Sequence, residues 1–526
     1  LLGLIIIIAA FLRLNKLSDN PPSLYWDEAS LGYNAFAILT TGHDEHGELL
    51  PLARFIAFGD YKPPGYIYAI VPFMALFGVG EFAIRFPSAF SGILMVIFTY
   101  WLAKKITGET TVGLAAAGLL AISPWSLQLS RAAFEAHLAA LFNLTAICLF
   151  IAGIKRHYFM PISALFFILS FYTFNANRIL TPIFILVLLV IYWKDSIKIK
   201  KWLVISVTVG LLLLVPSLSY LRSRESRLRF QEVTIFTSLN TITKANARIM
   251  RDGDTWWSRI IHNRRVYYAK DFLSHYADHF KGEFLFISGD RNPRLSILDV
   301  GELYWFEIPL IIIGVILLLF QRSKTTALLI AWGLFAPIPA ATARETPHML
   351  RTASILPIPQ IICGIAAVWL WNFVKTKSTV TKRSIYILVT LIVLVNLLYY
   401  FHNYWVHYPR DWSSEWQYGY SEMVTKVREH EDNYDRISVT QANGRPYIYF
   451  LLFNHVNPIV YMNIRKADRD WYGLWNVYGF GKYDFTEKPP VGGERVLRVK
   501  TGSNSTNKKI DEVKDPSGKT VFEIGE

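Results

Sequence analysis

Long blocks of apolar residues, separated by short polar segments, fill most of the first 400 positions of the chain. The blocks show neither the alternation of a half-buried strand nor the one-sided stripe of a surface helix. They therefore predict helices that are apolar all round. A helix that crosses a bilayer needs about 20 mainly apolar residues, with a lower limit near 17. The pattern predicts a polytopic α-helical membrane protein.

Basic clusters between the blocks set the topology, because short loops rich in lysine and arginine stay in the cytoplasm. The clusters lie at 104–105, 155–156, 194–201, 322–324 and 375–383. If each marks the inner side, about eleven blocks span the membrane, with the N-terminus inside and the C-terminus outside. These blocks are residues 1–11, 86–103, 112–125, 136–154, 158–174, 179–193, 202–220, 304–320, 327–339, 355–371 and 385–401.

The chain begins at Leu1 without a methionine, and its first apolar block is short. We therefore expect further residues to precede it in the natural protein. The block is interpreted as part of a membrane helix and not as a signal peptide, because no small-residue cleavage site follows it.

Two long segments fall on the outer side in this topology. The first covers residues 13–85 and contains an apolar stretch, 65–77, that is too short to span, so we interpret that stretch as an interfacial helix. The second covers residues 221–303 and is rich in arginine and aromatic residues such as Trp256 and Trp257. This composition is typical of a segment that lies against lipid headgroups.

The composition becomes that of a water-soluble domain after residue 401. Residues 421–431 read as a helix, 436–440 as a strand, and Asn443-Gly444 as a turn. We therefore predict a transmembrane domain over 1–401 and a small extracytoplasmic α/β domain over 402–526.

Overall composition supports the membrane assignment and excludes other classes. Hydrophobic residues make up 52% of the 526 residues and charged residues only 18%. The net charge of +14 does not indicate nucleic-acid binding, because the basic residues lie in the loops between apolar blocks. Cys148 and Cys363 both lie inside apolar blocks, so neither a disulfide framework nor a cysteine metal site is expected.

Charged residues near helix ends collect on the outer side, and the pair Asp27-Glu28 is the most unusual. Acidic side chains placed where a chain leaves a bilayer indicate a functional site. The other members of this set are Asp44, Glu45, Glu48, residues 60–64, Arg85, residues 130–135, Asn177, Arg178, residues 290–294, His348 and Arg351. The centres of the spans carry almost no charge, which argues against an ion transporter.

Carboxylates and several cations at one interface favour chemistry on an anionic lipid headgroup. An aspartate can accept a proton from an alcohol, while lysine and arginine hold a leaving phosphate. Since nucleotide sugars are not found on the outer face of a membrane, a sugar used there has to arrive on a lipid carrier. These residues therefore predict sugar transfer from a lipid phosphate.

Four motifs in order resemble a known family. They are Tyr25-Trp26-Asp27-Glu28, Lys62-Pro63-Pro64-Gly65-Tyr66, the segment 81–89, and Ser123-Pro124-Trp125 followed by Ser130-Arg131. Their order is similar to that of GT-C glycosyltransferases of the protein O-mannosyltransferase and aminoarabinose transferase type (glycosyltransferase family 39-like), over about 1–401. The resemblance implies a GT-C fold, a polyprenyl-phosphate-linked sugar donor and inversion at the anomeric carbon.

The resemblance also implies roles for individual acidic residues. Asp27 is expected to be the base that deprotonates the acceptor hydroxyl, and Glu28 to position the acceptor or tune the pKa of its neighbour. Glu135 lies where the family has a second acidic residue, although here it stands in Ala133-Phe134-Glu135-Ala136 and not in an aspartate-containing motif. Because attack occurs opposite the leaving phosphate, Asp27 is expected to face Lys62 across the sugar.

Six basic residues are expected to contact the donor phosphate or its lipid. They are Lys62, Arg85, Arg131, Arg178, His348 and Arg351. Other interpretations stay open at this point. Asp27-Glu28 fits the first turn of a helix, Lys62-Pro63-Pro64 fits an interfacial anchor before a helix, and Arg131 and Arg178 fit side chains that snorkel to headgroups.

His43 and His46 flank two carboxylates and are weak candidates for a metal site, with a solvated loop as the preferred interpretation. The predicted reaction requires no cofactor, and the sequence leaves a divalent cation open.

The sequence predicts an integral membrane glycosyltransferase of a bacterial or archaeal cell membrane, with an extracytoplasmic active site. It would transfer a hexose or pentose from a polyprenyl phosphate to a hydroxyl of a protein, glycolipid or glycan. A lipid or sugar transporter is the alternative from another class. A transporter would show polar residues in span centres and paired halves, and the sequence has neither.

Overall fold

The computed structural model describes residues 1–526 apart from 470–474, 490–491 and 504, and the chain forms two compact units. We call the first the helical unit; it comprises Leu1–Ala9, Gly92–Leu129 and Ala136–Leu397. We call the second the mixed unit; it comprises Ala10–Ser91, Ser130–Glu135 and Leu398–Glu526.

The long helices that lie wholly or partly in the helical unit correspond to the predicted apolar blocks. They are α1 (Leu2–Leu14), α4 (Glu81–Thr107), α5 (Thr110–Ile122), α6 (Pro124–Arg131), α7 (Glu135–Gly153), α8 (Phe159–Thr173), α9 (Asn177–Ile191), α11 (Lys200–Leu214), α17 (Glu307–Phe320), α18 (Lys324–Phe335), α20 (Ile358–Lys375) and α21 (Thr379–His402). Shorter helices of the unit include α10 (Trp193–Lys198), α12 (Leu218–Arg222), α13 (Arg224–Val233) and α19 (Ile338–Ala341).

Six helical segments of the described chain are long and apolar enough to cross a membrane. The helices α5 and α6 meet at a bend of 54° and count as a seventh if they form one span. The predicted blocks at α1, α8, α9 and α17 are helical but shorter than 18 residues. The helical nature of all eleven blocks is thus confirmed, whereas their number as spans stays a prediction.

Helices of this unit approach closely where glycine replaces a larger side chain. A Cβ atom at Gly364 of α20 would lie 3.0 Å from the backbone nitrogen of Ala116 in α5. One at Gly314 of α17 would lie 2.5 Å from the carbonyl oxygen of Ile362 in α20. Small residues at such contacts are typical of helix packing in membranes, where close backbone approach supplies the attraction.

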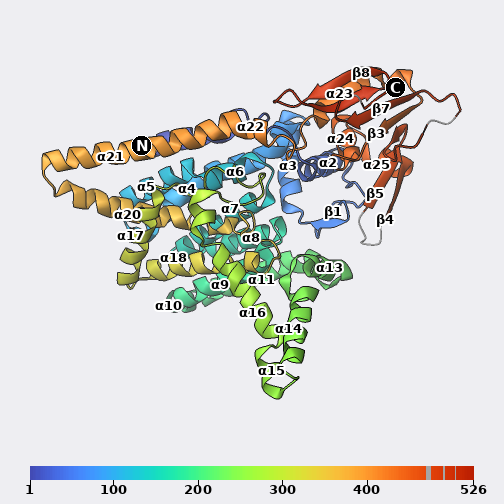
Figure 1. Ribbon diagram of the computed structural model, residues 1–526. Coiled ribbons are helices and arrows are strands. Elements are labelled where there is room, and N and C mark those ends of the chain that lie inside the picture. Colours follow the sequence, from blue (N-terminus) through green and yellow to red (C-terminus); the bar gives the residue numbers. More distant parts are fainter. Residues whose placement is uncertain (470–474, 490–491, 504) are drawn as a thin grey trace. The chain divides into compact units, whose positions relative to one another are not determined.

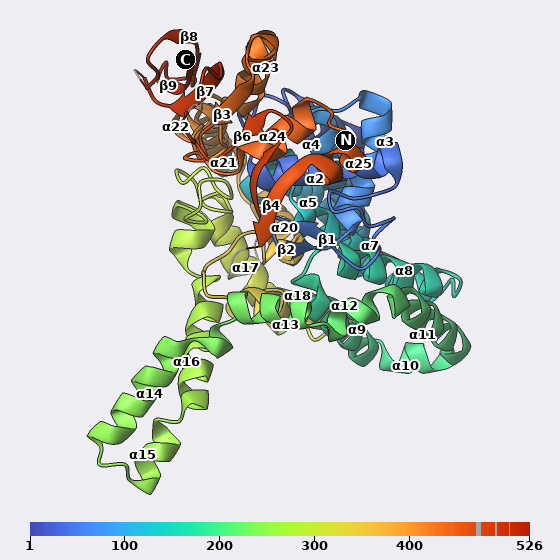
Figure 2. The ribbon, with the colours of Figure 1, turned by 90° about the vertical axis from the view of Figure 1, so that its right-hand side faces the viewer.

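The segment predicted to lie on headgroups contains a helical hairpin. It consists of α14 (Leu239–Arg251), α15 (Trp256–Ile261) and α16 (Arg264–Asp278), and Figure 2 shows α14 and α16 side by side with α15 at the tip. We call this element the arm. The sequence indicated its composition but not its helical structure.

The mixed unit contains a seven-stranded sheet in the order β4-β5-β6-β3-β7-β9-β8. The central strand β3 is parallel to both of its neighbours, and the outer pairs are antiparallel. The strands are β3 (Arg436–Val439), β4 (Arg465–Arg469), β5 (Trp475–Phe480), β6 (Tyr483–Asp484), β7 (Val496–Thr501), β8 (Lys509–Lys514) and β9 (Thr520–Gly525). Its helices include α22 (Tyr408–Asp411), α23 (Tyr420–His430), α24 (Pro446–Phe453) and α25 (Pro458–Ile464). The predicted C-terminal α/β elements are confirmed.

The first loop of the chain belongs to the same compact unit as this sheet. It forms α2 (Trp26–Thr41), β1 (Phe55–Ala57), β2 (Asp60–Lys62) and α3 (Gly65–Phe77), the helix that the short apolar stretch predicted. Most of α2 is buried, and it packs against both α3 and α24. The loop and the C-terminal residues therefore share one core, although the sequence placed them in separate domains.

Candidate active site

An ion pair between Asp27 and Lys62 forms the centre of the candidate site. Lys62 Nζ lies 2.9 Å from Asp27 Oδ1, and the two side chains are 17% and 26% exposed, so the pair is partly open to water. Asp27 stands in the first turn of α2 and Lys62 ends β2. The helix dipole favours a negative charge at this place, so the helix-start interpretation and a catalytic one are compatible.

The charged atoms of Asp27 and Lys62 touch directly in this structure. That the two residues face each other across a bound sugar stays a prediction. Opposite charges on two neighbouring elements attract each other more strongly in a partly buried site than in water. A phosphate that binds Lys62 would therefore have to compete with Asp27.

Three carboxylates keep Lys62 charged. Burial by itself would lower the pKa of the ammonium group, but Asp27, Glu135 and Asp60 more than offset this and raise the pKa above its ordinary value. Glu135 is the first residue of α7 and is buried. The structure thus gathers Asp27, Lys62 and Glu135, which the resemblance selected from three separate motifs.

Glu28 is buried and is paired with Arg85. Its Oε1 accepts hydrogen bonds from Arg85 Nε at 2.9 Å and from the backbone nitrogen of Ala133 at 2.8 Å, and its Oε2 accepts one from Arg85 Nη2 at 2.9 Å. Arg85 also donates to three backbone carbonyls in the segment that precedes α2, those of Leu17, Pro21 and Ser23. This bidentate pair is fully enclosed, so the geometry favours a positioning role for both residues.

Arg131 has a similar environment. Its guanidinium group donates to the carbonyls of Leu12 at 2.7 Å, Lys16 at 2.9 Å and Asn20 at 2.7 Å, and its Cζ lies 4.5 Å from the centre of the Trp405 ring. The side chain is completely buried. Because snorkelling needs a head group that reaches water, this burial excludes that interpretation, and the carbonyl contacts favour a structural role over contact with a phosphate.

Two residues of the C-terminal segment hold the backbone next to Asp27, and the sequence did not indicate either. Gln417 Oε1 accepts a hydrogen bond from the backbone nitrogen of Trp26 at 2.7 Å, and its amide nitrogen donates to the carbonyl of Asn443 at 2.8 Å. The Tyr449 hydroxyl lies 3.0 Å from Gln417 Oε1 and 3.0 Å from the carbonyl of Leu24. No local pattern could have identified this contact, since 391 positions separate Gln417 from Trp26.

The segment around the two histidines is only partly exposed, and His46 is packed against the C-terminal residues of the same unit. His46 is stacked on Trp475 with ring centres 5.4 Å apart, and its Nδ1 faces Arg465 Nη1 at 3.1 Å. Burial, with Arg465 and two further arginines, lowers the pKa of His46 to about 3. A guanidinium group in contact with this ring opposes a cation there, and the described part of the chain has no group of three or more metal-ligating side chains.

Arg178 and Arg351 line one cavity of the helical unit. Its other walls include Phe174, Tyr220 and Pro339. Arg178 Cζ lies 5.1 Å from the centre of the Tyr220 ring, an arrangement that stabilises a cation on an aromatic face. Cationic groups on an apolar wall are suited to a phosphate that carries a lipid chain.

His348 lies in a buried polar cluster of the same unit. Its backbone nitrogen donates to His279 Nε2 at 3.1 Å, and the next backbone nitrogen, that of Met349, donates to Asp290 Oδ2 at 2.8 Å. Burial lowers the pKa of His348 well below its usual range, so its ring is neutral at physiological pH. Any contact of His348 with a phosphate would be a neutral hydrogen bond.

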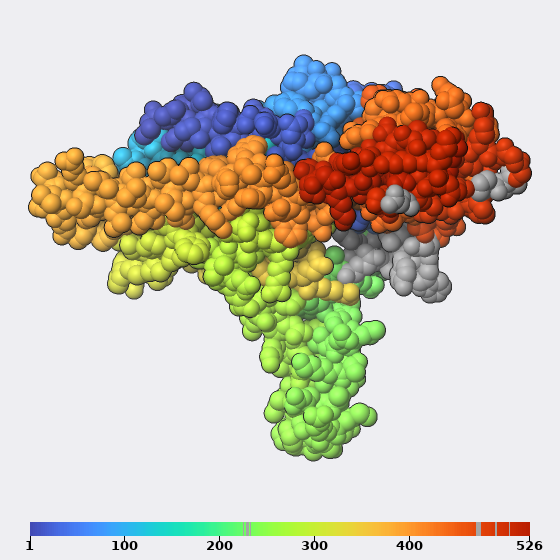
Figure 3. Space-filling model, turned by 45° about the horizontal axis from the view of Figure 1, so that its top comes forward, coloured from blue at the N-terminus to red at the C-terminus, as the bar shows by residue number. Residues whose placement is uncertain are grey.

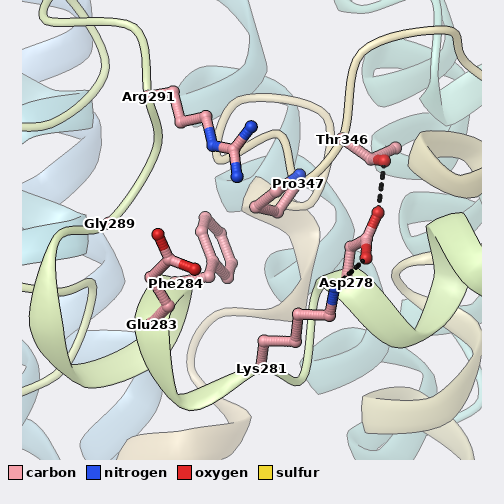
Figure 4. A pocket seen from close by; sticks show the side chains of 8 residues that line it. All are labelled: Asp278, Lys281, Glu283, Phe284, Gly289, Arg291, Thr346 and Pro347. Carbon is pink, nitrogen blue, oxygen red and sulfur yellow. Dashed lines mark hydrogen bonds and ion pairs between the residues drawn. The ribbon is translucent and has the colours of Figure 1, made fainter.

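A small cavity of about 150 Å³ adjoins this cluster (Figure 4). Asp278 accepts a hydrogen bond from the Thr346 hydroxyl at 2.7 Å and pairs with Lys281 at 2.7 Å. Arg291 and Glu283 also line the cavity, so its two cations are matched by two carboxylates. This balance gives the cavity no preference for an anion.

Sequence comparison finds one family. Residues 61–220 match the family described as dolichyl-phosphate-mannose-protein mannosyltransferase. The matched region includes Lys62, Arg85, Arg131, Glu135 and Arg178, whereas Asp27 precedes it. No curated protein sequence matches the chain.

Structure comparison finds similar solved structures, among them those of two enzymes. ArnT from Cupriavidus metallidurans in the apo state has a TM-score of 0.54 at 11% identity, with 99% of this chain and 97% of that chain covered. The structure of ArnT bound to undecaprenyl phosphate has a TM-score of 0.50 at 12% identity, with 85% of this chain and 84% of that chain covered. The apo oligosaccharyltransferase of Archaeoglobus fulgidus has a TM-score of 0.54 at 14% identity, with 86% of this chain covered.

The chain spans 63% of the length of the Archaeoglobus enzyme. At these identities the comparisons show the fold. Both neighbours are GT-C glycosyltransferases, so the chain has a GT-C fold, and the resemblance that its motifs predicted is confirmed.

Proposed function

We propose that the protein transfers one sugar from a polyprenyl phosphate to a hydroxyl acceptor, with inversion, on the extracytoplasmic face of its membrane. The observation that carries this proposal is the accessible Asp27–Lys62 pair with Glu135 beside it. The family match and the GT-C fold support the same reaction class. The polyprenyl-phosphate donor is further supported by the undecaprenyl phosphate bound in the ArnT structure.

Asp27 is the general base in this mechanism. Its carboxylate takes the proton of the acceptor hydroxyl as the hydroxyl oxygen attacks the anomeric carbon. The bond between that carbon and the phosphate oxygen breaks, and the polyprenyl phosphate leaves with the electron pair. Asp27 then returns the proton to water.

Lys62 stabilises the leaving phosphate. Its high pKa keeps it cationic, and an ammonium group next to a developing phosphate dianion is a strong electrostatic contribution to the transition state. When the donor phosphate takes Lys62 as its partner, Asp27 loses its counter-ion and becomes free to accept the proton. The ion pair of the structure thus couples donor binding to activation of the base.

The remaining site residues support this pair. Glu135 adds a negative charge that keeps Lys62 protonated, and the Glu28–Arg85 pair fixes the first turn of α2. In the helical unit, Arg178 and Arg351 are proposed to contact the phosphate or the lipid of the donor, because they place cations on an apolar wall. The reaction needs no metal ion in this scheme.

The test is release of polyprenyl phosphate from a panel of polyprenyl-phosphate sugars by the purified protein in lipid. Asp27→Asn should abolish release while donor binding is largely kept, because the base is lost and Lys62 remains. Asp19→Asn, at an exposed carboxylate of the same loop, is the matched control and should behave as the wild type. Wild-type turnover by Asp27→Asn would refute the assignment of the base.

A further inference from the structure

The tip of the arm exposes a cluster of large apolar side chains. Met250 is 78% and Trp256 77% exposed, and Trp257, Ile260 and Ile261 are also open to the surroundings. Isolated exposed apolar residues are ordinary, but a contiguous group of this size indicates a surface that is covered in use.

An apolar stripe continues from the tip along α16. Arg265, Tyr268, Ala269, Phe272 and Leu273 line a shallow hollow together with Phe236, whose ring meets that of Tyr268 edge to face at 6.0 Å. The spacing of these five positions places them on one face of the helix. The hollow is apolar along its length and has an arginine at one end.

Positive charge surrounds the same tip. Residues 248–265 contain five arginines and two aspartates, which leaves an excess of three positive charges. One aspartate, Asp254, is paired with Arg259 at 2.6 Å. Basic residues that flank exposed tryptophan and isoleucine are the pattern of an element that lies at the surface of an anionic bilayer.

The direction of the arm fits such a surface. In Figure 1 the arm runs crosswise to the long helices of its own unit, such as α18 and α20, and Figure 3 shows its tip standing clear of them. A helix that runs across the direction of the spans lies parallel to the plane of the bilayer. Tryptophan rings prefer that depth, where the ring is apolar and its N–H group reaches water or headgroups.

We propose that the arm is an interfacial anchor that binds the headgroup region of an anionic phospholipid leaflet. Trp256, Trp257 and Ile260 enter the headgroup boundary, and the stripe on α16 takes the upper part of an acyl chain. The tip arginines, among them Arg251 and Arg264, contact lipid phosphates. This inference is independent of the proposed sugar transfer.

The test uses the full-length protein, one copy per lipid nanodisc, with a fluorescent label on Ile260→Cys. The native Cys148 and Cys363 are buried and provide no accessible thiol. Nitroxides near the headgroups of phosphatidylcholine–phosphatidylglycerol discs should quench the label, and aqueous iodide should not. A label on Ser274→Cys is the matched control, because Ser274 is exposed and lies opposite the stripe on α16; iodide should quench it.

Charge reversal tests the lipid specificity. The double variant Arg251→Glu with Arg264→Glu should lose most lipid quenching at Ile260 in the anionic discs, whereas the Ser274 label should not change. Equal iodide quenching of the Ile260 and Ser274 labels in the proteins without the charge reversal would overturn the proposal. Protection of the Ile260 label only in discs that hold two copies would show a protein interface instead, and would overturn it as well.

Discussion

Asp27 and Glu28 are neighbours in sequence, but their environments differ completely. Successive side chains of a helix point in directions about 100° apart, so one acid of the first turn of α2 faces Lys62 and the other faces the interior. Glu28 meets Arg85 there, out of contact with water. One carboxylate is therefore available for chemistry, and the other stabilises the loop that carries it.

Glu28→Gln should destabilise the protein strongly. The substitution leaves the buried Arg85 without its counter-charge, and breaking a buried pair in this way costs about 3–5 kcal/mol. Thermal unfolding in detergent should show a clear drop in Tm. Asp27→Asn is the control and should leave the Tm nearly unchanged, because its ion pair is partly exposed; equal Tm values for both variants would contradict the assigned roles.

Lys62→Ala should weaken the use of the donor. A charge-assisted hydrogen bond to a phosphate contributes about 1.5–3 kcal/mol, which corresponds to a rise in donor KM of roughly 10- to 150-fold. Steady-state kinetics with varied donor would measure it, with Lys466→Ala as an exposed control on β4. An unchanged donor KM would favour the interpretation of Lys62 as an interfacial anchor.

Glu45 gives the fold a pH dependence. Burial raises the pKa of this carboxyl from 4.5 to about 7, although Tyr447 donates a hydrogen bond to it. The folded state thus holds the proton more tightly than the unfolded state. The tighter proton binding stabilises the folded state fully below about pH 4.5. This contribution to the free energy of unfolding, about 3 kcal/mol, is lost as the pH rises through 7.

Glu45→Gln should therefore match the wild type in Tm near pH 5 and exceed it above pH 8, because the amide stays neutral. Thermal unfolding across this pH range measures the difference. Glu429→Gln, at an exposed position of α23, should show no such trend. A Tm difference that does not change with pH would show that Glu45 does not titrate in this range.

At the scale of elements, the start of α2 depends on a contact from the far end of the chain. Gln417 accepts the hydrogen bond of the Trp26 backbone and so sets the position of the next residue, Asp27. Gly444 stands against the same tryptophan, where a Cβ atom would lie 2.6 Å from the indole ring. Short-range sequence patterns describe α2 well but contain nothing of this contact.

Gln417→Ala should lower kcat and leave the donor KM nearly unchanged. Loss of the hydrogen bond, worth about 1 kcal/mol, shifts the base without altering Lys62, so a fall of roughly fivefold is expected. Gln417→Glu keeps an acceptor oxygen for the Trp26 nitrogen and should restore part of the rate. A change in Tm alone, with no change in kcat, would show a purely structural role.

At the scale of the molecule, the mixed unit is assembled from three separate stretches of chain. Residues 10–91 supply Asp27 and Lys62, residues 130–135 supply Glu135, and residues 398–526 supply Gln417. The C-terminal segment thus shares its core with the first loop and does not form a separate domain.

Removal of residues 402–526 should therefore unfold the first loop. Helix α2 would lose its contact with α24, and its apolar face would open to water. The residues flanking α2 would lose the hydrogen bonds of Tyr449 to Leu24 and of Tyr447 to Glu45. Limited proteolysis should then cleave between 20 and 60 in the truncated protein but not in the full chain. Equal protection in both proteins would show that the loop folds without the C-terminal segment.

The sequence by itself determined where the helices of the apolar blocks form and which motifs are candidates for the chemistry. Apolar blocks become helices because hydrophobicity and hydrogen bonding act over neighbouring residues, and 65–77 forms α3 within the predicted limits. Only the tertiary structure decided that Asp27 contacts Lys62, that Arg85 and Arg131 are enclosed, and that Gln417 holds Trp26. These contacts join residues far apart in the chain, so they depend on how folded elements pack, and burial then decides which charges remain available for chemistry.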